Sequence, residues 1–257
     1  MTGLVLAAGV GKRLAPLTDE RPKGLIELGG RSLLARLLDG FAALGVRQAT
    51  LVVGYRQEAI RAQLGASHRG MPVRYLENPA YTKGPILSLW TGRAEFERDD
   101  VLLADGDVLF APPLLARVIG APEANAFLAE PEFPDTGEEI VVYSRAGQVV
   151  ALRRGVMGPP EALFDARAEW VGFVKIGRAA GRELAATLER FVREDRIEGD
   201  YEAALDALLP RHRFVACSTA GLPWIEIDFP QDLQAAETEI LPRIDRLDSS
   251  GRAPGLL

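Results

Sequence analysis

Five residues near the start of the chain have the types and spacing that a nucleoside triphosphate site requires. Gly9 and Gly11 lie in a run of small residues, so backbone N–H groups can approach an anion without side chains in the way. Lys12 and Arg13 follow directly, and Lys23 comes ten residues after Arg13. A short apolar run before the glycines is typical of a buried strand. Strand, bare loop and convergent positive charge indicate a triphosphate site; a tight turn with ordinary surface cations is the alternative.

Two acidic pairs further along the chain have the spacing of metal ligands. Asp105 and Asp107 follow an apolar run, and Glu226 and Asp228 alternate with isoleucines. Residues two apart share one face of an extended chain, so each pair can point at one cation. Oxygen ligands beside a phosphate-bearing substrate favour Mg²⁺. The alternatives are an Asp-Gly turn for the first pair, and for the second the polar face of an edge strand with a helix cap at Asp228.

The glycine loop fits neither of two familiar phosphate loops. The dinucleotide fingerprint needs a third glycine where this chain has Leu14, and no Lys-Ser/Thr follows as a P-loop requires. The segment instead resembles the signature of nucleotidyltransferases of the sugar-phosphate and phosphocholine type. The matching residues are Leu6-Ala7-Ala8-Gly9-Val10-Gly11-Lys12-Arg13-Leu14 and Pro22-Lys23.

This resemblance implies roles for the charged residues. Asp107 and Asp228 match the two positions that hold the catalytic Mg²⁺ in the family. Arg13 is expected to hold the β- and γ-phosphates, and Lys23 to bridge the α-phosphate and the attacking oxygen, which makes both catalytic. The positions expected to bind the nucleotide are Leu6, Ala7, Ala8, Gly9, Gly11, Arg13, Lys83, Gly84, Ser88 and Asp105.

The second half of the chain resembles a subgroup, the cytidylyltransferases that activate phosphocholine, aminoalkyl phosphonates or inositol 1-phosphate. The segments that carry this resemblance are Tyr81-Thr82-Lys83, Ser88-Leu89-Trp90, Glu138-Glu139, Glu169-Trp170-Val171-Gly172, Tyr201-Glu202, Glu226-Ile227-Asp228 and Asp232-Leu233. Two departures concern specificity. Gly84-Pro85 stands where many relatives have paired asparagines, and Ile140-Val141 where phosphonate-type relatives have Met-Lys.

Acidic and aromatic residues in these segments predict the acceptor. Carboxylates pair with ammonium groups, and indole or phenol rings attract cations through their quadrupole. We therefore expect a cationic acceptor such as phosphocholine, phosphoethanolamine or an aminoalkyl phosphonate. The alternative is that Trp170 is core and the glutamates are solvated surface. The expected acceptor-binding residues are Glu138, Glu139, Glu169, Trp170, Tyr201 and Glu202.

Hydrophobic periodicity predicts an α/β fold. Buried strands at 49–53, 71–76 and 100–104 alternate with helices at 32–44, 57–64 and 85–96, which argues for a mostly parallel, doubly wound sheet with its site at the strands' carboxyl ends. Shorter strands follow at 126–129, 140–143, 149–152, 170–176 and 224–227, with helices at 178–193 and 200–209.

These segments predict one domain over residues 1–245. We expect a Rossmann-like nucleotide half (about 1–120), an added antiparallel acceptor lobe (about 121–229) and a closing helix (about 230–243), followed by a flexible tail at 246–257.

Composition narrows the function classes. The 257 residues carry a net charge of −6, which argues against a nucleic-acid partner. No apolar run approaches the roughly 20 residues of a membrane span, and no signal peptide is recognised, so a cytoplasmic location is expected. Cys217, the single cysteine, is expected to be buried, and two histidines offer little for a zinc site or a triad.

The sequence therefore predicts a Mg²⁺-dependent nucleotidylyltransferase, with CTP and a phosphorylated small molecule as substrates and with no nucleic-acid or membrane partner. Two alternatives stay open. One is a sugar-1-phosphate nucleotidylyltransferase that uses UTP, dTTP or GTP. The other is a catalytically silent nucleotide-binding subunit, against which the joint presence of Arg13, Lys23, Asp107 and Asp228 argues.

Overall fold

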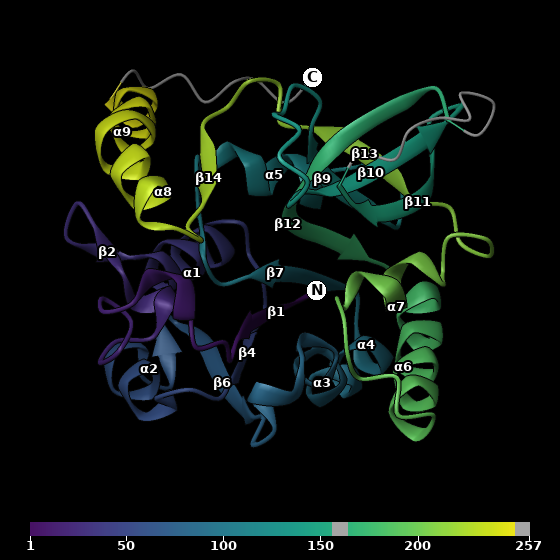
Figure 1. Ribbon diagram of the computed structural model, residues 1–257, viewed down its shortest axis with the longest axis horizontal. Coiled ribbons are helices and arrows are strands. Elements are labelled where there is room, and N and C mark those ends of the chain that lie inside the picture. Colours follow the sequence, from purple (N-terminus) through teal and green to yellow (C-terminus); the bar gives the residue numbers. More distant parts are fainter. Residues whose placement is uncertain (156–163, 250–257) are drawn as a thin grey trace.

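The computed structural model describes residues 1–155 and 164–249 and shows the expected α/β architecture (Figure 1). Its centre is a parallel group of strands in the order β7-β1-β4-β6. These strands comprise β1 (Thr2–Ala7), β4 (Ala49–Val53), β6 (Met71–Glu77) and β7 (Val101–Asp105). Leu6 of β1 is paired with both Val52 and Asp105, so the nucleotide loop and the first acidic pair leave the sheet at the same edge.

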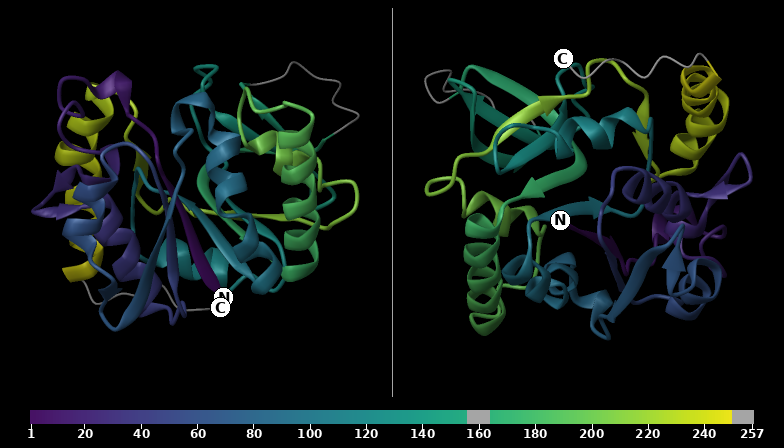
Figure 2. Two further views of the ribbon diagram at one scale, coloured as in Figure 1. Left: turned by 90° about the horizontal axis from the view of Figure 1, so that it is seen from below. Right: turned by 180° about the vertical axis from the view of Figure 1, so that it is seen from behind.

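Helices cover both faces of this sheet, which explains why its strands are apolar throughout (Figure 2). On β1, Val5 packs with α1 (Leu33–Ala43), α2 (Gln57–Leu64) and α5 (Pro113–Ile119). Its neighbour Leu4 points to the other face, towards α3 (Pro85–Thr91), α4 (Arg93–Arg98) and α6 (Arg178–Arg193). The doubly wound arrangement is thereby confirmed.

An antiparallel lobe extends the sheet from β7, as expected. The long strand β12 (Ala166–Ile176) pairs with β7 through Phe173–Ile176 and with β10 (Ile140–Arg145) through its first half. β10 and β11 (Gln148–Arg154) form the predicted hairpin, and β9 (Ala126–Glu130) joins β12 to β13 (Val215–Ser218). The register of β12 shifts near Gly172, whose φ of 85° suits glycine.

A two-stranded ribbon that the sequence analysis did not foresee links the two halves. β8 (Val108–Phe110) pairs antiparallel with β14 (Trp224–Glu226), and the Ile227 N–H donates to the Asp107 carbonyl at 3.1 Å. The remaining short elements are β2 (Glu27–Leu28), β3 (Arg31–Ser32), β5 (Ser67–His68), α7 (Glu202–Asp206) and three 3₁₀ turns at Lys12–Leu14, Lys23–Leu25 and Tyr81–Lys83.

Several helix boundaries differ from the expected ones. The helix expected over 85–96 is divided at Gly92, where an added Cβ would come within 2.8 Å of the Leu4 side chain. The helix expected over 200–209 is regular only in α7, because turns follow it. Ser32 caps α1 as expected, since its hydroxyl accepts the Ala35 N–H at 3.3 Å.

The closing helix starts at Pro230, as predicted. Its first turn is fixed by Asp232, whose carboxylate accepts the backbone N–H groups of Asp228 and Phe229 at 2.9 and 2.7 Å. α8 (Pro230–Ala235) passes through a π-helical turn into α9 (Leu241–Ser249), so helix continues beyond residue 245. Residues 250–257 of the expected tail lie outside the described residues. In the described part of the chain, no helix combines the length and apolarity that a membrane crossing demands.

Candidate active site

The glycine loop forms a small cavity at the carboxyl end of β1. Gly11 adopts a left-handed conformation (φ 68°) and begins the turn that carries Arg13, while the Thr18 hydroxyl donates to the Gly11 carbonyl at 2.8 Å. The conformation of the loop is therefore fixed by the left-handed Gly11 and by the buried Thr18. Its cavity of about 300 Å³ is lined by eight of the expected site residues: Leu6, Ala7, Gly9, Gly11, Arg13, Lys23, Asp107 and Asp228. Ala8 is buried directly behind the loop.

The two acidic pairs meet beside this loop because β8 and β14 are paired. Carboxylate oxygens of Asp107, Glu226 and Asp228 lie within 4.8 Å of one another. One Asp107 oxygen is buried and accepts no hydrogen bond from any residue that the structure describes. These three carboxylates, one of which has an unsatisfied buried oxygen, form an all-oxygen donor set that suits Mg²⁺. The expected ligands Asp107 and Asp228 are therefore together, and Glu226, which its spacing had paired with Asp228, joins them.

Lys23 is the counter-charge to this acidic group. Its ammonium makes an ion pair with Asp107 at 2.8 Å and a second one with Asp228. Burial opposes the charged form of Lys23, but Asp107, Asp228 and Glu226 outweigh it and raise the pKa of the amine above its usual value. The side chain is only 12% exposed, so it is a fixed charge placed between the two expected metal ligands.

Two carboxylates, one in this acidic group and one next to it, have displaced pKa values. Burial, then Asp107 and Asp228, raises the pKa of Glu226 to about 8, although its carboxylate opens onto the cleft. Burial, with Asp107, Glu226 and Glu202 after it, raises the pKa of Asp105 well above its usual range. The Tyr201 hydroxyl donates to both Asp105 oxygens at 2.8 and 2.9 Å. Asp105 is therefore held by Tyr201 at the wall of the large cavity and is not part of the acidic cluster.

A larger cavity of about 990 Å³ lies between the loop and the antiparallel lobe. Five of the six expected acceptor residues line it: Glu138, Glu139, Glu169, Trp170 and Glu202. Tyr201 does not; its ring is buried behind Trp170, with ring centroids 5.7 Å apart, and its hydroxyl positions Asp105.

These carboxylates differ in how far the protein already satisfies them. The Glu139 oxygens accept N–H groups of Thr136 and Gly137 at 3.0–3.1 Å and the Thr136 hydroxyl at 2.5 Å. Burial opposes ionisation of Glu139, but these bonds outweigh it and lower its pKa. Glu169 has no hydrogen bond or ion pair among the described residues, and burial, followed by Glu139 and Glu130, raises its pKa to about 7. Glu139 fixes a loop, whereas Glu169 is free for a ligand.

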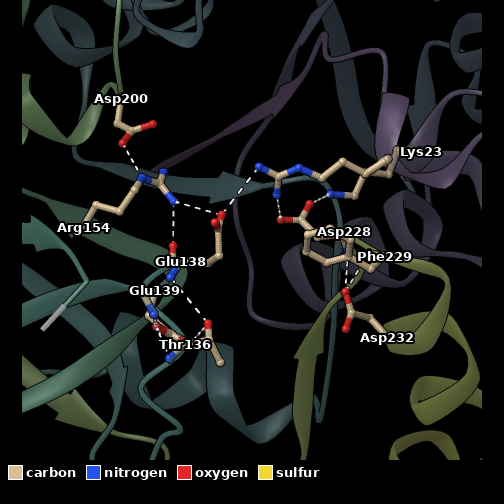
Figure 3. Close-up of polar contacts among 11 residues, drawn as sticks. Lys23, Thr136, Glu138, Glu139, Arg154, Asp200, Asp228, Phe229 and Asp232 are labelled. Atoms are coloured by element: carbon tan, nitrogen blue, oxygen red, sulfur yellow. Dashed lines mark hydrogen bonds and ion pairs between the residues drawn. The ribbon is translucent and has the colours of Figure 1, made fainter.

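A chain of ion pairs crosses the cleft from the acceptor lobe to the nucleotide loop (Figure 3). Arg154 contacts Asp200 at 2.8 Å and donates to the Glu138 carbonyl at 2.6 Å. The Glu138 carboxylate lies 3.5 Å from Arg13, whose other guanidinium nitrogen lies 3.3 Å from Asp228. Arg13, the cation expected to bind phosphates, is therefore held by two carboxylates from the second half of the chain.

The segment expected to recognise the base lies apart from both cavities. Lys83, Gly84 and Ser88 are not among the residues that line either one. Gly84 has a φ of 138°, and an added Cβ would meet the Ile197 carbonyl at 2.4 Å. The Ser88 hydroxyl is buried and accepts a bond from Asn78 at 3.0 Å.

Sequence reasoning missed several residues that the fold brings to the site. Glu226 alone carried a local signal, its alternation with Asp228. Thr18 gave none, although the Gly11 carbonyl that it contacts lies only seven residues away. Glu130, Arg154 and Trp224 gave none because they reach the site through contacts that are distant in sequence.

Comparisons with known proteins identify the family of this chain. The chain is 34% identical over 250 residues to CMP-5'-(3-aminopropyl)phosphonate synthase of Streptomyces rubellomurinus, covering 93% of this chain and 38% of that protein. It is 32% identical over 241 residues to the bifunctional IPC transferase and DIPP synthase of Rubrobacter xylanophilus, covering 92% and 51%. The chain thus spans about a third to a half of the length of these relatives.

The fold matches that of CTP:phosphocholine cytidylyltransferase from Streptococcus pneumoniae with a TM-score of 0.73 at 18% identity, covering 92% of this chain and 97% of the other. Residues 3–195 match the MobA-like NTP transferase domain. A glycine loop with Arg13 and Lys23, opposite paired carboxylates on the same scaffold, is in keeping with that match, and the chain belongs to the MobA-like NTP transferase family of nucleotidyltransferases.

Proposed function

We propose that this protein is a Mg²⁺-dependent nucleotidylyltransferase that transfers CMP from CTP to a phosphorylated or phosphonate-bearing small molecule and releases pyrophosphate. The observation that carries the proposal is Lys23, fixed between Asp107 and Asp228 at the mouth of the glycine loop. A cation in this place lies where the α-phosphate and an incoming anionic oxygen would have to approach each other. A site for nucleotide binding alone has no need of it.

In this reaction an acceptor phosphate or phosphonate oxygen attacks the α-phosphorus. The bond from the α-phosphorus to the bridging oxygen breaks, and pyrophosphate leaves with the electron pair. The Gly9–Gly11 backbone and Arg13 bind the β- and γ-phosphates, where negative charge accumulates, and Lys23 holds the two reacting groups together. Positioning and charge neutralisation of this kind account for most of the catalysis in such displacements.

Asp107 and Asp228, with Glu226 beside them, would hold the Mg²⁺. When bound, the ion supplies further positive charge next to the phosphates. Because Lys23 pairs with the same carboxylates, we expect its ammonium to turn towards the phosphates when the ion is present.

The acidic lining of the large cavity supports a cationic acceptor. Glu169 and one oxygen of Glu202 lack hydrogen-bond partners among the described residues, and Trp170 forms part of the same wall. A neutral sugar would leave these carboxylates without a counter-charge in a partly buried site, which is unfavourable. The names of two of the relatives, an aminopropylphosphonate synthase and a phosphocholine cytidylyltransferase, support the same chemistry.

The test is pyrophosphate release over a grid of CTP, UTP, dTTP, GTP and ATP against phosphocholine, phosphoethanolamine, 2-aminoethylphosphonate, inositol 1-phosphate and hexose 1-phosphates. We expect CTP with a phosphorylated amine to give the highest kcat/KM. A hexose 1-phosphate as best acceptor would replace the proposal with a sugar-phosphate enzyme. No release in any cell of the grid, with NTP binding retained, would favour a silent nucleotide-binding subunit.

A further inference from the structure

Two glutamates of the acceptor cavity face each other across neighbouring strands. Glu130 on β9 and Glu169 on β12 are directly paired in the antiparallel register, and both line the cavity. Like charges directly opposite each other on neighbouring strands destabilise a sheet. A pairing of this kind at a cavity wall is accounted for if a cationic group of the ligand lies between the two carboxylates.

The two glutamates of this pair differ in the hydrogen bonds that the protein makes to them. Glu130 is held rigid, because it accepts the Thr219 hydroxyl at 2.6 Å, the Trp224 indole N–H at 3.4 Å and the Glu132 backbone N–H at 3.1 Å. Glu169 makes no such bond among the described residues. One carboxylate is therefore a fixed anchor, and the other keeps its acceptor sites for a donor that the protein itself does not supply.

A second carboxylate of the same cavity also lacks a hydrogen-bond donor from the described residues. Glu202 on α7 also lines the cavity, and its Oε2 atom is buried and finds no hydrogen-bond partner in the described part of the chain. A buried carboxylate oxygen without a partner is costly, so each such group calls for an N–H or O–H donor from a ligand.

Aromatic faces, by contrast, are scarce on the described walls of this cavity. Trp170 is only 6% exposed, and edges of Phe127 and Tyr201 pack against it with centroids 5.7 Å away. The Phe229 ring is covered by Arg13 at 5.0 Å. Trp224 is the third aromatic residue in the described lining. The walls thus lack the several open ring faces that enclose a quaternary ammonium in an aromatic cage.

We propose that the cavity selects a primary ammonium over a quaternary one, with Glu169 and the anchored Glu130 accepting its N–H bonds. This inference rests on the proposed function and narrows its acceptor class. A primary ammonium has three N–H donors that can approach carboxylates to about 2.8 Å, whereas a trimethylammonium has none and is kept further away by its methyl groups. The two cations carry the same charge, so hydrogen bonding and size decide between them.

The experiment is a methylation series on the wild-type protein. Steady-state pyrophosphate release is measured with phosphoethanolamine and its N-methyl, N,N-dimethyl and N,N,N-trimethyl forms, at saturating concentration of the best NTP. We expect kcat/KM to fall at each step and by at least tenfold over the series, chiefly through acceptor KM. Equal or better use of the trimethyl form, phosphocholine, overturns the inference while leaving the proposed function intact. Absence of release with every phosphorylated amine overturns the proposed function instead.

Variants assign the preference to residues. Glu169→Gln should raise KM for phosphoethanolamine and leave KM for the NTP unchanged. The ratio of kcat/KM for phosphoethanolamine to that for phosphocholine should fall to less than about threefold. Glu130→Gln should act in the same direction. Glu198→Gln, which removes the same charge from an exposed site outside the cavity, is the matched control. An undiminished advantage in both Glu169→Gln and Glu130→Gln, with unfolding temperatures near that of the wild type, would exclude the pair as its source.

Discussion

The two walls of the cleft are opposite in charge and in construction. The nucleotide wall combines a bare backbone with the cations Arg13 and Lys23, all within 23 residues of the start of the chain. The acceptor wall presents glutamates from β9, β12, α7 and the loop before β10. The walls neutralise each other where they meet, through Arg13 with Glu138 and Lys23 with Asp228. This contrast is the one that the proposed substrates require: a polyphosphate on one side and an ammonium on the other.

The largest effect is expected from the carboxylates that join the walls. Asp107→Ala and Asp228→Ala should each lower kcat by at least a hundredfold, because a bound metal ion contributes several kcal/mol to the transition state. Pyrophosphate release at saturating Mg²⁺ measures this. Asp19→Ala, an exposed carboxylate in the same half, is the control. Retention of more than about a tenth of the wild-type rate would remove that residue from the ligand set.

Next come the two cations of the nucleotide wall, which we expect to differ from each other. Lys23→Ala should reduce kcat by roughly a hundredfold with a smaller change in KM, since its contacts tighten as charge develops. Arg13→Ala should also raise KM for the NTP clearly, because Arg13 contacts phosphates in the ground state too. Full titrations in both substrates separate the two constants. An unchanged kcat in Lys23→Ala would mean that the fixed ammonium is structural.

The free energy of unfolding should depend on pH because Glu169 of the acceptor wall has a raised pKa. The pKa of Glu169 is about 7 in the folded protein against 4.5 for a free side chain, so the folded state binds more protons between these values. The free energy of unfolding should therefore fall as pH rises from about 4.5 to 7, by an amount on the order of 1–2 kcal/mol.

Glu169→Gln removes this contribution and should raise the unfolding temperature of the ligand-free protein at pH 8 more than at pH 5. Glu130, Glu139 and Glu226 face the same region and provide the background titration, so the variant is compared with wild type at each pH. An identical difference at both pH values would contradict a raised pKa at Glu169.

The smallest effect is expected where the walls touch. Arg13 and Glu138 are 52% and 59% exposed, and exposed ion pairs contribute at most about 1 kcal/mol. Glu138→Gln should lower KM for the NTP by no more than about fivefold, because Arg13 becomes free for phosphate, and high salt should reduce the difference. A loss of kcat beyond tenfold would instead place Glu138 in the chemistry.

The sequence by itself determined the features that local spacing encodes. The apolar strands, the glycine loop with its cations and the Ser32 cap follow from neighbours within a few residues, and the structure confirms them. Spacing of two paired Glu226 with Asp228, which the fold brings together, and Asp105 with Asp107, of which only Asp107 is in the acidic cluster. It was the resemblance that paired Asp107 with Asp228. The resemblance of these motifs to nucleotidyltransferases indicated the family.

Only the tertiary structure decided which polar groups are already satisfied and which still need a ligand. Glu139 and Glu169 are both glutamates in acidic segments, yet Glu139 is bound by its own loop, whereas Glu169 is paired across strands with Glu130. Tyr201 and Trp170 are both aromatic, but Tyr201 lies behind the wall. Such differences depend on strand register and on contacts between residues that are distant in sequence. Spacing along the chain does not contain this information, because only folding brings those residues together.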